Sequence, residues 1–116
     1  MLTLDWKKYT NGKWCRLLDL DLAHSHFDNL KGVYAIWHMG LQPKWVRIGQ
    51  GEIRDRLGKH REDSEIISFR AHGLFVTWAP VDADFRDGIE RFLGEKLNPL
   101  VGSKFPDVYP IPVNIP

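Results

Sequence analysis

Hydrophobic residues along this chain fall into dense runs and into runs with helical spacing. The dense runs, at 32–39, 45–48 and 74–79, are rich in β-branched and aromatic residues and therefore predict strands. Gly40, Gln42 and Pro43 supply turn residues between the first two runs, which we expect to pair as an antiparallel hairpin. Pro80 is expected to end the third strand.

Two other segments show the spacing of an amphipathic helix. Ile53 and Leu57 are four residues apart within 52–60, which predicts one buried stripe on a short helix. A longer helix is expected before Pro99, capped by Asp82 or Asp84. Its apolar positions recur at helical spacing, at Phe85, Ile89, Phe92, Leu93 and Leu97.

The two ends of the chain have different patterns. Asn11-Gly12 lies between aromatic-rich runs and predicts an N-terminal hairpin. Prolines alternate with β-branched residues after Gly102, which predicts an extended tail that lies against the domain. The expected fold is α/β in the broad sense (α+β): a small central antiparallel sheet of about three strands flanked by helices. We expect a single domain over 1–116, with an N-terminal extension at 1–30, a core at 32–102 and the extended Pro-rich tail at 103–116.

Composition narrows the class of protein. The 116 residues are 43% hydrophobic and include five Trp, six Phe and three Tyr, enough apolar surface for one core without disulfides. The single Cys15 and the lack of a long apolar run predict a cytoplasmic protein with no membrane segment. A formal net charge of +1 gives no global indication of a nucleic-acid partner, and it leaves the oligomeric state open.

Basic residues nevertheless cluster locally. They concentrate in and just before the predicted helix 52–60, and the cluster consists of Arg47, Arg54, Arg56, Lys59, His60 and Arg61. Such a cluster is typical of a surface that contacts phosphates. It is also compatible with a solvated helix face that pairs with Glu52, Asp55 and Glu62.

The order of several short motifs resembles that of the GIY-YIG nuclease superfamily. Gly32-Val33-Tyr34 is similar to the first name motif, and Arg47-Ile48-Gly49 is similar to the second with arginine in place of tyrosine. Arg56-Leu57 with His60 is similar to the helix motif of the family, and Glu90 stands at the position of the glutamate on its later helix.

The resemblance implies a metal-dependent endonuclease that hydrolyses DNA phosphodiester bonds. It implies that Tyr34 takes part in activating water, that Arg56 contacts the phosphate and that Glu90 holds a single Mg²⁺ or Mn²⁺ ion. His60 is expected to handle a proton or orient the phosphate, and Arg47 to clamp it or favour a Tyr34 phenolate. The remaining basic residues of the helix region are expected to bind nucleic acid: Arg54, Lys59 and Arg61.

Two departures from the family pattern leave an inactive relative as the alternative. Arginine cannot act as a base, so Arg47 removes one phenol from the site. Gly102 stands where an asparagine is expected, with Asn98 or Asn114 as substitutes. A nucleic-acid-binding module without catalysis, or a protein-interaction module that uses the Pro-rich tail, therefore stays open. Trp37, Trp45 and Trp78 are expected mainly in the core, with a smaller chance that one is exposed and stacks on a base.

Overall fold

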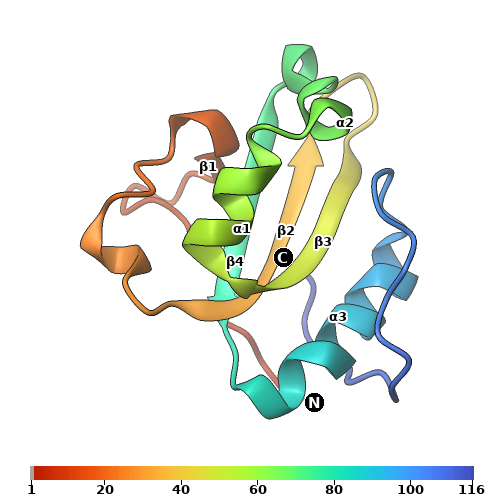
Figure 1. The fold of residues 1–116 in the computed structure, drawn as a ribbon. Helices are drawn as coiled ribbons and strands as arrows, with labels where there is room; N and C mark the ends of the chain where they lie inside the picture. Colours follow the sequence, from red (N-terminus) through yellow and green to blue (C-terminus); the bar gives the residue numbers. More distant parts are fainter. Residues whose placement is uncertain (1) are drawn as a thin grey trace.

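Four antiparallel strands form the centre of the molecule (Figure 1). The computed structural model describes residues 2–116, so Met1 of the predicted N-terminal extension lies outside the described residues. The sheet has the order β1-β4-β2-β3. Its strands are β1 (Cys15–Arg16), β2 (Lys31–His38), β3 (Lys44–Glu52) and β4 (Leu74–Pro80).

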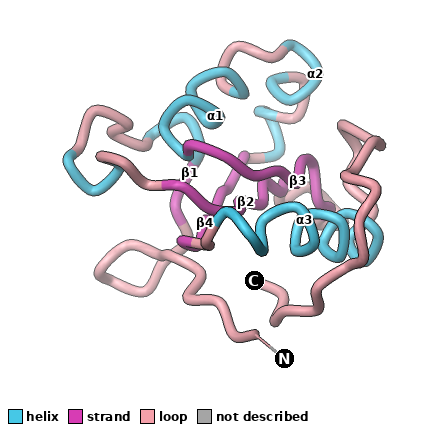
Figure 2. Tube along the Cα trace, turned by 60° about the horizontal axis from the view of Figure 1, so that its bottom comes forward, coloured by secondary structure: helices cyan, strands magenta, loops and turns pink. Residues whose placement is uncertain are grey.

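Helices cover both faces of this sheet, as Figure 2 shows. Helices α1 and α2 lie on one side and α3 on the other, with three short 3₁₀ turns in the connections. The helices are α1 (Ile53–His60), α2 (Ser64–Ile67) and α3 (Ala83–Leu97), and the turns are η1 (Leu17–Asp19), η2 (Ser25–Phe27) and η3 (Arg70–His72).

Strand alternation divides the core in two. Tyr34 and Ile36 of β2 point towards α1, whereas Val33 and Ala35 point towards α3. Each helix buries its apolar stripe against one of these faces, since successive strand residues point to opposite sides. The predicted β2–β3 hairpin and both predicted helices are therefore confirmed, and α3 ends at Leu97 as expected.

Three expectations for the fold need correction. The sheet has four strands rather than about three, because Cys15–Arg16 pairs with Val76 and Phe75 of β4. The turn around Asn11-Gly12 forms, but its two arms attach to β4 instead of making a regular hairpin, and the Lys7 amide donates to the Trp78 carbonyl. The helix α2 was not predicted, because its four residues are too few to show a period.

The C-terminal segment packs over α3. The Phe105 ring occupies the space beside Gly94, and the Ile111 side chain occupies the space beside Gly88. Val113 is buried and forms a parallel bridge with Leu2, so the two ends of the described chain meet on the α3 side of the sheet (Figure 2). Asn114 reinforces this junction by accepting a hydrogen bond from the Leu4 amide at 2.6 Å and donating one to the Leu4 carbonyl at 3.0 Å.

Substitution of two helical glycines tests this packing, because the two changes are expected to shift the free energy of unfolding in opposite directions. Gly94→Ala places a methyl group inside the Phe105 ring and is expected to lower the free energy of unfolding by about 1–3 kcal/mol. Gly58→Ala, in α1, meets nothing within 4 Å and is expected to raise it by roughly 0.5–1 kcal/mol through helix propensity. Urea denaturation of both variants measures the effects, and equal shifts in the two would contradict the packing described.

Candidate functional site

A buried phenol–imidazole pair lies at the centre of the candidate site. The Tyr34 hydroxyl of β2 and Nε2 of His60, at the end of α1, are 2.5 Å apart. Tyr34 is 1% exposed and His60 7%. This bond joins residues 26 positions apart in the chain and holds the end of α1 against β2.

Arg47 lies on the same face of the sheet as Tyr34 by regular strand alternation, and a β-bulge next to it brings Val46 to that face as well. Ile36 pairs with Arg47 and Trp37 with Trp45, so β3 has one extra residue, Val46, at this point. Val46 belongs to the core cluster on the α1 side, and Arg47 acts electrostatically on the Tyr34–His60 pair. Without the extra residue, strict alternation would separate the Val46 and Arg47 side chains onto opposite faces.

Glycines provide the space for three of the site side chains. A Cβ atom at Gly49 would overlap the Tyr34 hydroxyl across the β2–β3 ladder, and one at Gly102 would overlap the Arg47 guanidinium. Gly51 has φ of +131° and lies against Arg56, whose Nε would be 3.2 Å from an added Cβ. The sequence prediction missed this role of Gly51 and Gly102. For Gly51 a signal was visible, because Gly49 and Gly51 are spaced Gly-x-Gly just before a helix.

Glu90 approaches from the opposite face of the sheet. It lies on α3 beside the buried Ile89, and α3 is tied to β3 by a hydrogen bond of 2.9 Å from Gln50 Nε2 to Asp87 Oδ1. Since β3 is an edge strand, a side chain on α3 can reach the charges on the α1 side around that edge. Glu90 is half-buried and interacts electrostatically with both Arg47 and Arg56.

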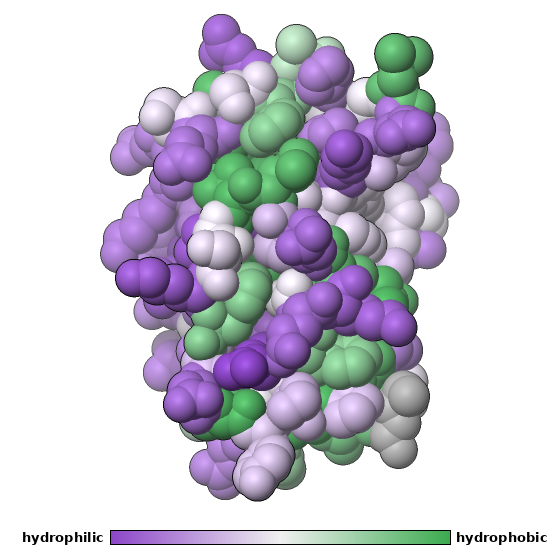
Figure 3. Space-filling view, turned by 90° about the vertical axis from the view of Figure 1, so that its right-hand side faces the viewer, coloured by the Kyte–Doolittle hydropathy of each residue, from purple (hydrophilic) through white to green (hydrophobic). Residues whose placement is uncertain are grey.

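Tyr34 and His60 are in contact, and Arg47, Arg56 and Glu90 lie near enough to act on this pair or on one another by charge. Tyr34, Arg47 and His60 come from the sheet and the end of α1, Arg56 from the exposed side of α1 and Glu90 from α3. Figure 3 looks onto the side of the molecule that carries β3 and α3, and hydrophilic side chains cover most of it.

Electrostatics keep the central pair neutral. Burial raises the pKa of Tyr34, and the charges of Arg47 and Arg56 offset part of that rise. Burial lowers the pKa of His60 to about 4, and the charge of Arg47 adds to this effect. A protonated phenol therefore meets an unprotonated imidazole near neutral pH, and the Tyr34 hydroxyl is the donor when His60 carries its proton on Nδ1.

One nitrogen of the Arg47 guanidinium lacks a hydrogen bond within the described part of the chain. Its Nε is buried and has no hydrogen-bond partner among residues 2–116. Burial and the neighbouring Asp87 raise the pKa of Glu90, and the charges of Arg47 and Arg56 oppose that rise. Such a buried donor without a partner calls for an explanation, and a bound ligand that accepts a hydrogen bond would supply one.

The residues proposed as additional nucleic-acid contacts have defined intramolecular partners. Arg54 donates to the carbonyls of Leu22 and His24 and forms an ion pair of 2.7 Å with Asp28. Arg61 donates to two carbonyls of the N-terminal segment, at Leu17 and Leu20. Lys59 is exposed and lies 3.3 Å from Asp55. The two arginines thus anchor the N-terminal segment to α1, and their contact with nucleic acid stays a prediction.

The two asparagines considered as substitutes for the one expected at residue 102 have other roles in the fold. Asn98 is exposed and adopts a left-handed conformation as the C-cap of α3. Asn114 bonds to Leu4, at the junction of the chain ends. At Gly102 itself the backbone has φ of +83° and leaves the room that the Arg47 guanidinium fills, so the two departures from the family pattern are spatially linked.

The donor set fits a weakly held divalent ion rather than a preformed metal centre. Residues 2–116 contain no group of three or more His, Cys, Asp or Glu side chains placed to hold a metal. Glu90 is the carboxylate at the site, with Asp87 one turn earlier on α3. Mg²⁺ and Mn²⁺ accept such a sparse set because they retain water and take phosphate oxygens as ligands.

Comparison of the chain with protein-family models, curated proteins and solved structures gives no match. Within residues 2–116, no helix combines the length and apolar character needed to cross a membrane. The functional inference therefore depends on the arrangement of Tyr34, Arg47, Arg56, His60 and Glu90.

The neutral state of His60 makes stability depend on pH. An unfolded histidine has a pKa of 6.5, whereas the folded value is about 4, so the unfolded chain binds more protons between these pH values. Stability is therefore lost as the pH falls from about 6.5 towards 4, with a contribution from His60 of about 2 kcal/mol between pH 7 and pH 4.5. Urea titrations at both pH values should show a smaller loss for His60→Gln. An equal loss in the two proteins would contradict a buried neutral His60.

Proposed function

We propose that this chain is a metal-dependent endonuclease that hydrolyses DNA phosphodiester bonds at the β3 edge. The observation that carries the proposal is the meeting of one phenol–imidazole pair, two arginines and one glutamate drawn from β2, β3, α1 and α3. The resemblance to the GIY-YIG nucleases, based on the same residues, supports this reaction class.

Arg47 and Arg56 bind the scissile phosphate. A guanidinium presents parallel N–H donors that match two phosphate oxygens, and its charge offsets the charge that builds up during in-line attack. Arg47 has a buried Nε available, and Arg56 is exposed to an incoming strand. Because Tyr34 is 1% exposed, engagement of the phosphate moves both arginines outward and admits the attacking water to the phenolic oxygen.

Proton transfer follows the Tyr34–His60 hydrogen bond. As the water oxygen forms its bond to phosphorus, the water proton passes to the Tyr34 oxygen and the Tyr34 proton passes to His60 Nε2. The phosphorus–oxygen bond to the leaving strand breaks, and that oxygen takes a proton from solvent. This relay needs no phenolate, which agrees with the raised pKa of Tyr34. Glu90 would hold Mg²⁺ or Mn²⁺, which supplies Lewis-acid stabilisation of the oxygens around phosphorus when bound.

A catalytically inactive module that binds nucleic acid is the second candidate. Two observations favour it: the Tyr34 hydroxyl is enclosed, and Arg47 with Gly102 replaces two polar groups of the family pattern. Such a module would bind DNA in a salt-sensitive manner without cutting it.

Nicking of supercoiled plasmid in Mg²⁺ or Mn²⁺ tests the proposal. We expect the unmodified chain to nick, and Tyr34→Phe to lose roughly 10²–10⁴-fold in rate because the relay is broken. Arg56→Ala and Glu90→Ala should each lose about 10²-fold or more, since each removes a stabilising group at the reacting phosphate. Lys104→Ala and Glu65→Ala, which remove exposed charges elsewhere, serve as matched controls and should nick normally. Cleavage that survives all three site changes would contradict the proposal, and binding without nicking would establish the inactive module.

A further inference from the structure

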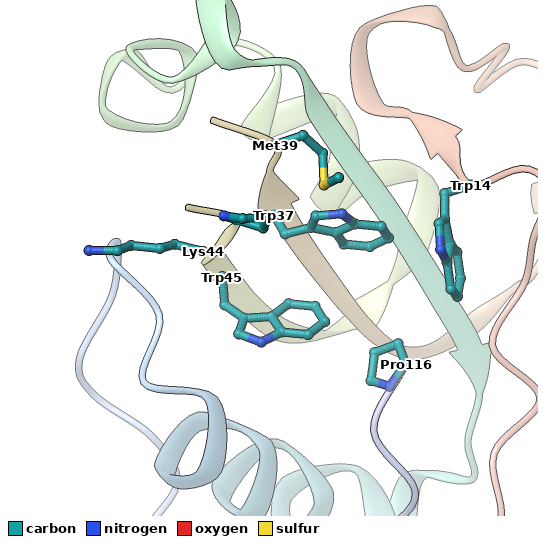
Figure 4. A pocket seen from close by; sticks show the side chains of 7 residues that line it. Trp14, Trp37, Met39, Lys44, Trp45 and Pro116 are labelled. Atoms are coloured by element: carbon teal, nitrogen blue, oxygen red, sulfur yellow. The ribbon is translucent and has the colours of Figure 1, made fainter. Parts of the chain in front are cut away.

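A tryptophan-lined pocket opens beside the β2–β3 turn, and the proposed reaction does not use it (Figure 4). Its volume of about 320 Å³ lies within the range of small-ligand sites, roughly 300–1,000 Å³. The pocket is lined by Trp14, Trp37, Met39, Pro43, Lys44, Trp45 and Pro116. The expectation that Trp37 and Trp45 are core residues is therefore only partly right, because both are half-buried, whereas Trp78 is buried.

The indole rings of this pocket pack against one another. Trp37 and Trp45 face each other across the β2–β3 ladder with ring centroids 5.5 Å apart. Trp14 meets Trp37 edge to face at 5.2 Å, and Phe75 stacks on the other side of Trp37 at 6.0 Å. Rings fixed in this way lose little entropy when a flat ligand stacks on them.

Cations surround this aromatic cluster. The Lys8 ammonium lies 4.2 Å from the centroid of the Trp14 ring, and the Arg16 guanidinium lies 5.0 Å from that of Phe75. Lys44 lines the pocket and is exposed, and no Asp or Glu side chain lines it. A cationic guest such as a methylated lysine would be repelled here, whereas a flat ring attached to phosphate would be attracted.

We propose that this pocket binds a base of an unpaired DNA strand, with neighbouring phosphates held by Lys8 and Lys44. Aromatic platforms beside lysines are the usual means of binding single strands, because every base offers a π-face when it is unpaired. A duplex cannot offer that face, since its bases are stacked and paired. The inference rests on the proposed function in naming DNA, and it specifies a substrate with an unpaired segment.

The pocket and the candidate site share strand β3. Trp45 lines the pocket and Arg47, two residues later, belongs to the site. Bulge residue Val46 stands between them, and Leu100 and Val101 donate amide hydrogen bonds to the Trp45 and Val46 carbonyls at 3.0 and 2.8 Å. Because Trp45 packs on the α3 side of the sheet and Arg47 lies on the α1 side, a single strand bound at both features would have to pass around the β3 edge.

Fluorescence anisotropy with a fluorescein-labelled 15-nucleotide oligo(dT), in EDTA, tests the inference. We expect tighter binding to oligo(dT) than to a blunt duplex of equal length, and Trp14→Ala should weaken oligo(dT) binding about tenfold. Trp14→Phe keeps a stacking ring and should recover most of the affinity. Lys44→Gln should lower the slope of log K against log salt by about 0.7. Tyr109→Ala, which removes an aromatic ring that is 94% exposed on the tail, is the matched control and should bind normally.

Binding to the duplex as tight as to oligo(dT), or an unchanged affinity in a Trp14→Ala protein with the unmodified circular dichroism spectrum, would overturn the inference. So would saturable binding of a proline-rich peptide without binding of oligo(dT). Tyr34→Phe, whose change lies on the other face of the sheet, should retain full oligo(dT) binding. Absence of nicking by the unmodified chain, together with intact oligo(dT) binding, would thus remove the proposed function alone, and nicking by the unmodified chain without oligo(dT) binding would remove the pocket alone.

Discussion

The close approach of Tyr34 to Gly49 across the β2–β3 ladder is the contact on which the candidate site depends. The Tyr34 phenol fits here because residue 49 is a glycine, and any Cβ at that position would push the Tyr34 hydroxyl away from His60. The hydrogen bond between Tyr34 and His60 in turn fixes the end of α1 against the sheet. The backbone pairing of two strands thus sets the position of a helix and of both arginines beside it.

The second constraint is that β3 lies at the edge of the sheet. Side chains on opposite faces of a central strand are separated by the sheet itself, whereas an edge lets Glu90 from α3 act on Arg47 and Arg56 from the α1 side. Regular alternation from Gly49 places Arg47 on the α1 side of this strand, and Gly102 leaves it space. Arg47 and Gly102 consequently depend on each other, because the guanidinium fills the room that a larger side chain at 102 would take.

Sequence patterns predicted the parts of the fold that depend on local periodicity. The β2–β3 hairpin, α1, β4 and α3 show clear periods, and the motif order led to the candidate site residues, whose role stays a prediction. The pairing of Cys15–Arg16 with β4 was missed, because two residues have no period and the pairing partner is distant in sequence. The partners of Arg54 and Arg61 were equally hidden, since backbone carbonyls of a folded N-terminal segment leave no sequence signal. The enclosed state of Tyr34 and the aromatic pocket arise from packing between elements, which residue patterns do not encode.

A crystal structure of the chain with a short DNA strand and Mn²⁺ tests the central claim most directly. The account predicts a phosphate within hydrogen-bond distance of the Arg47 and Arg56 guanidiniums, with the anomalous Mn²⁺ peak at the Glu90 carboxylate. A well-ordered strand whose phosphates and Mn²⁺ contact none of these three side chains would contradict it.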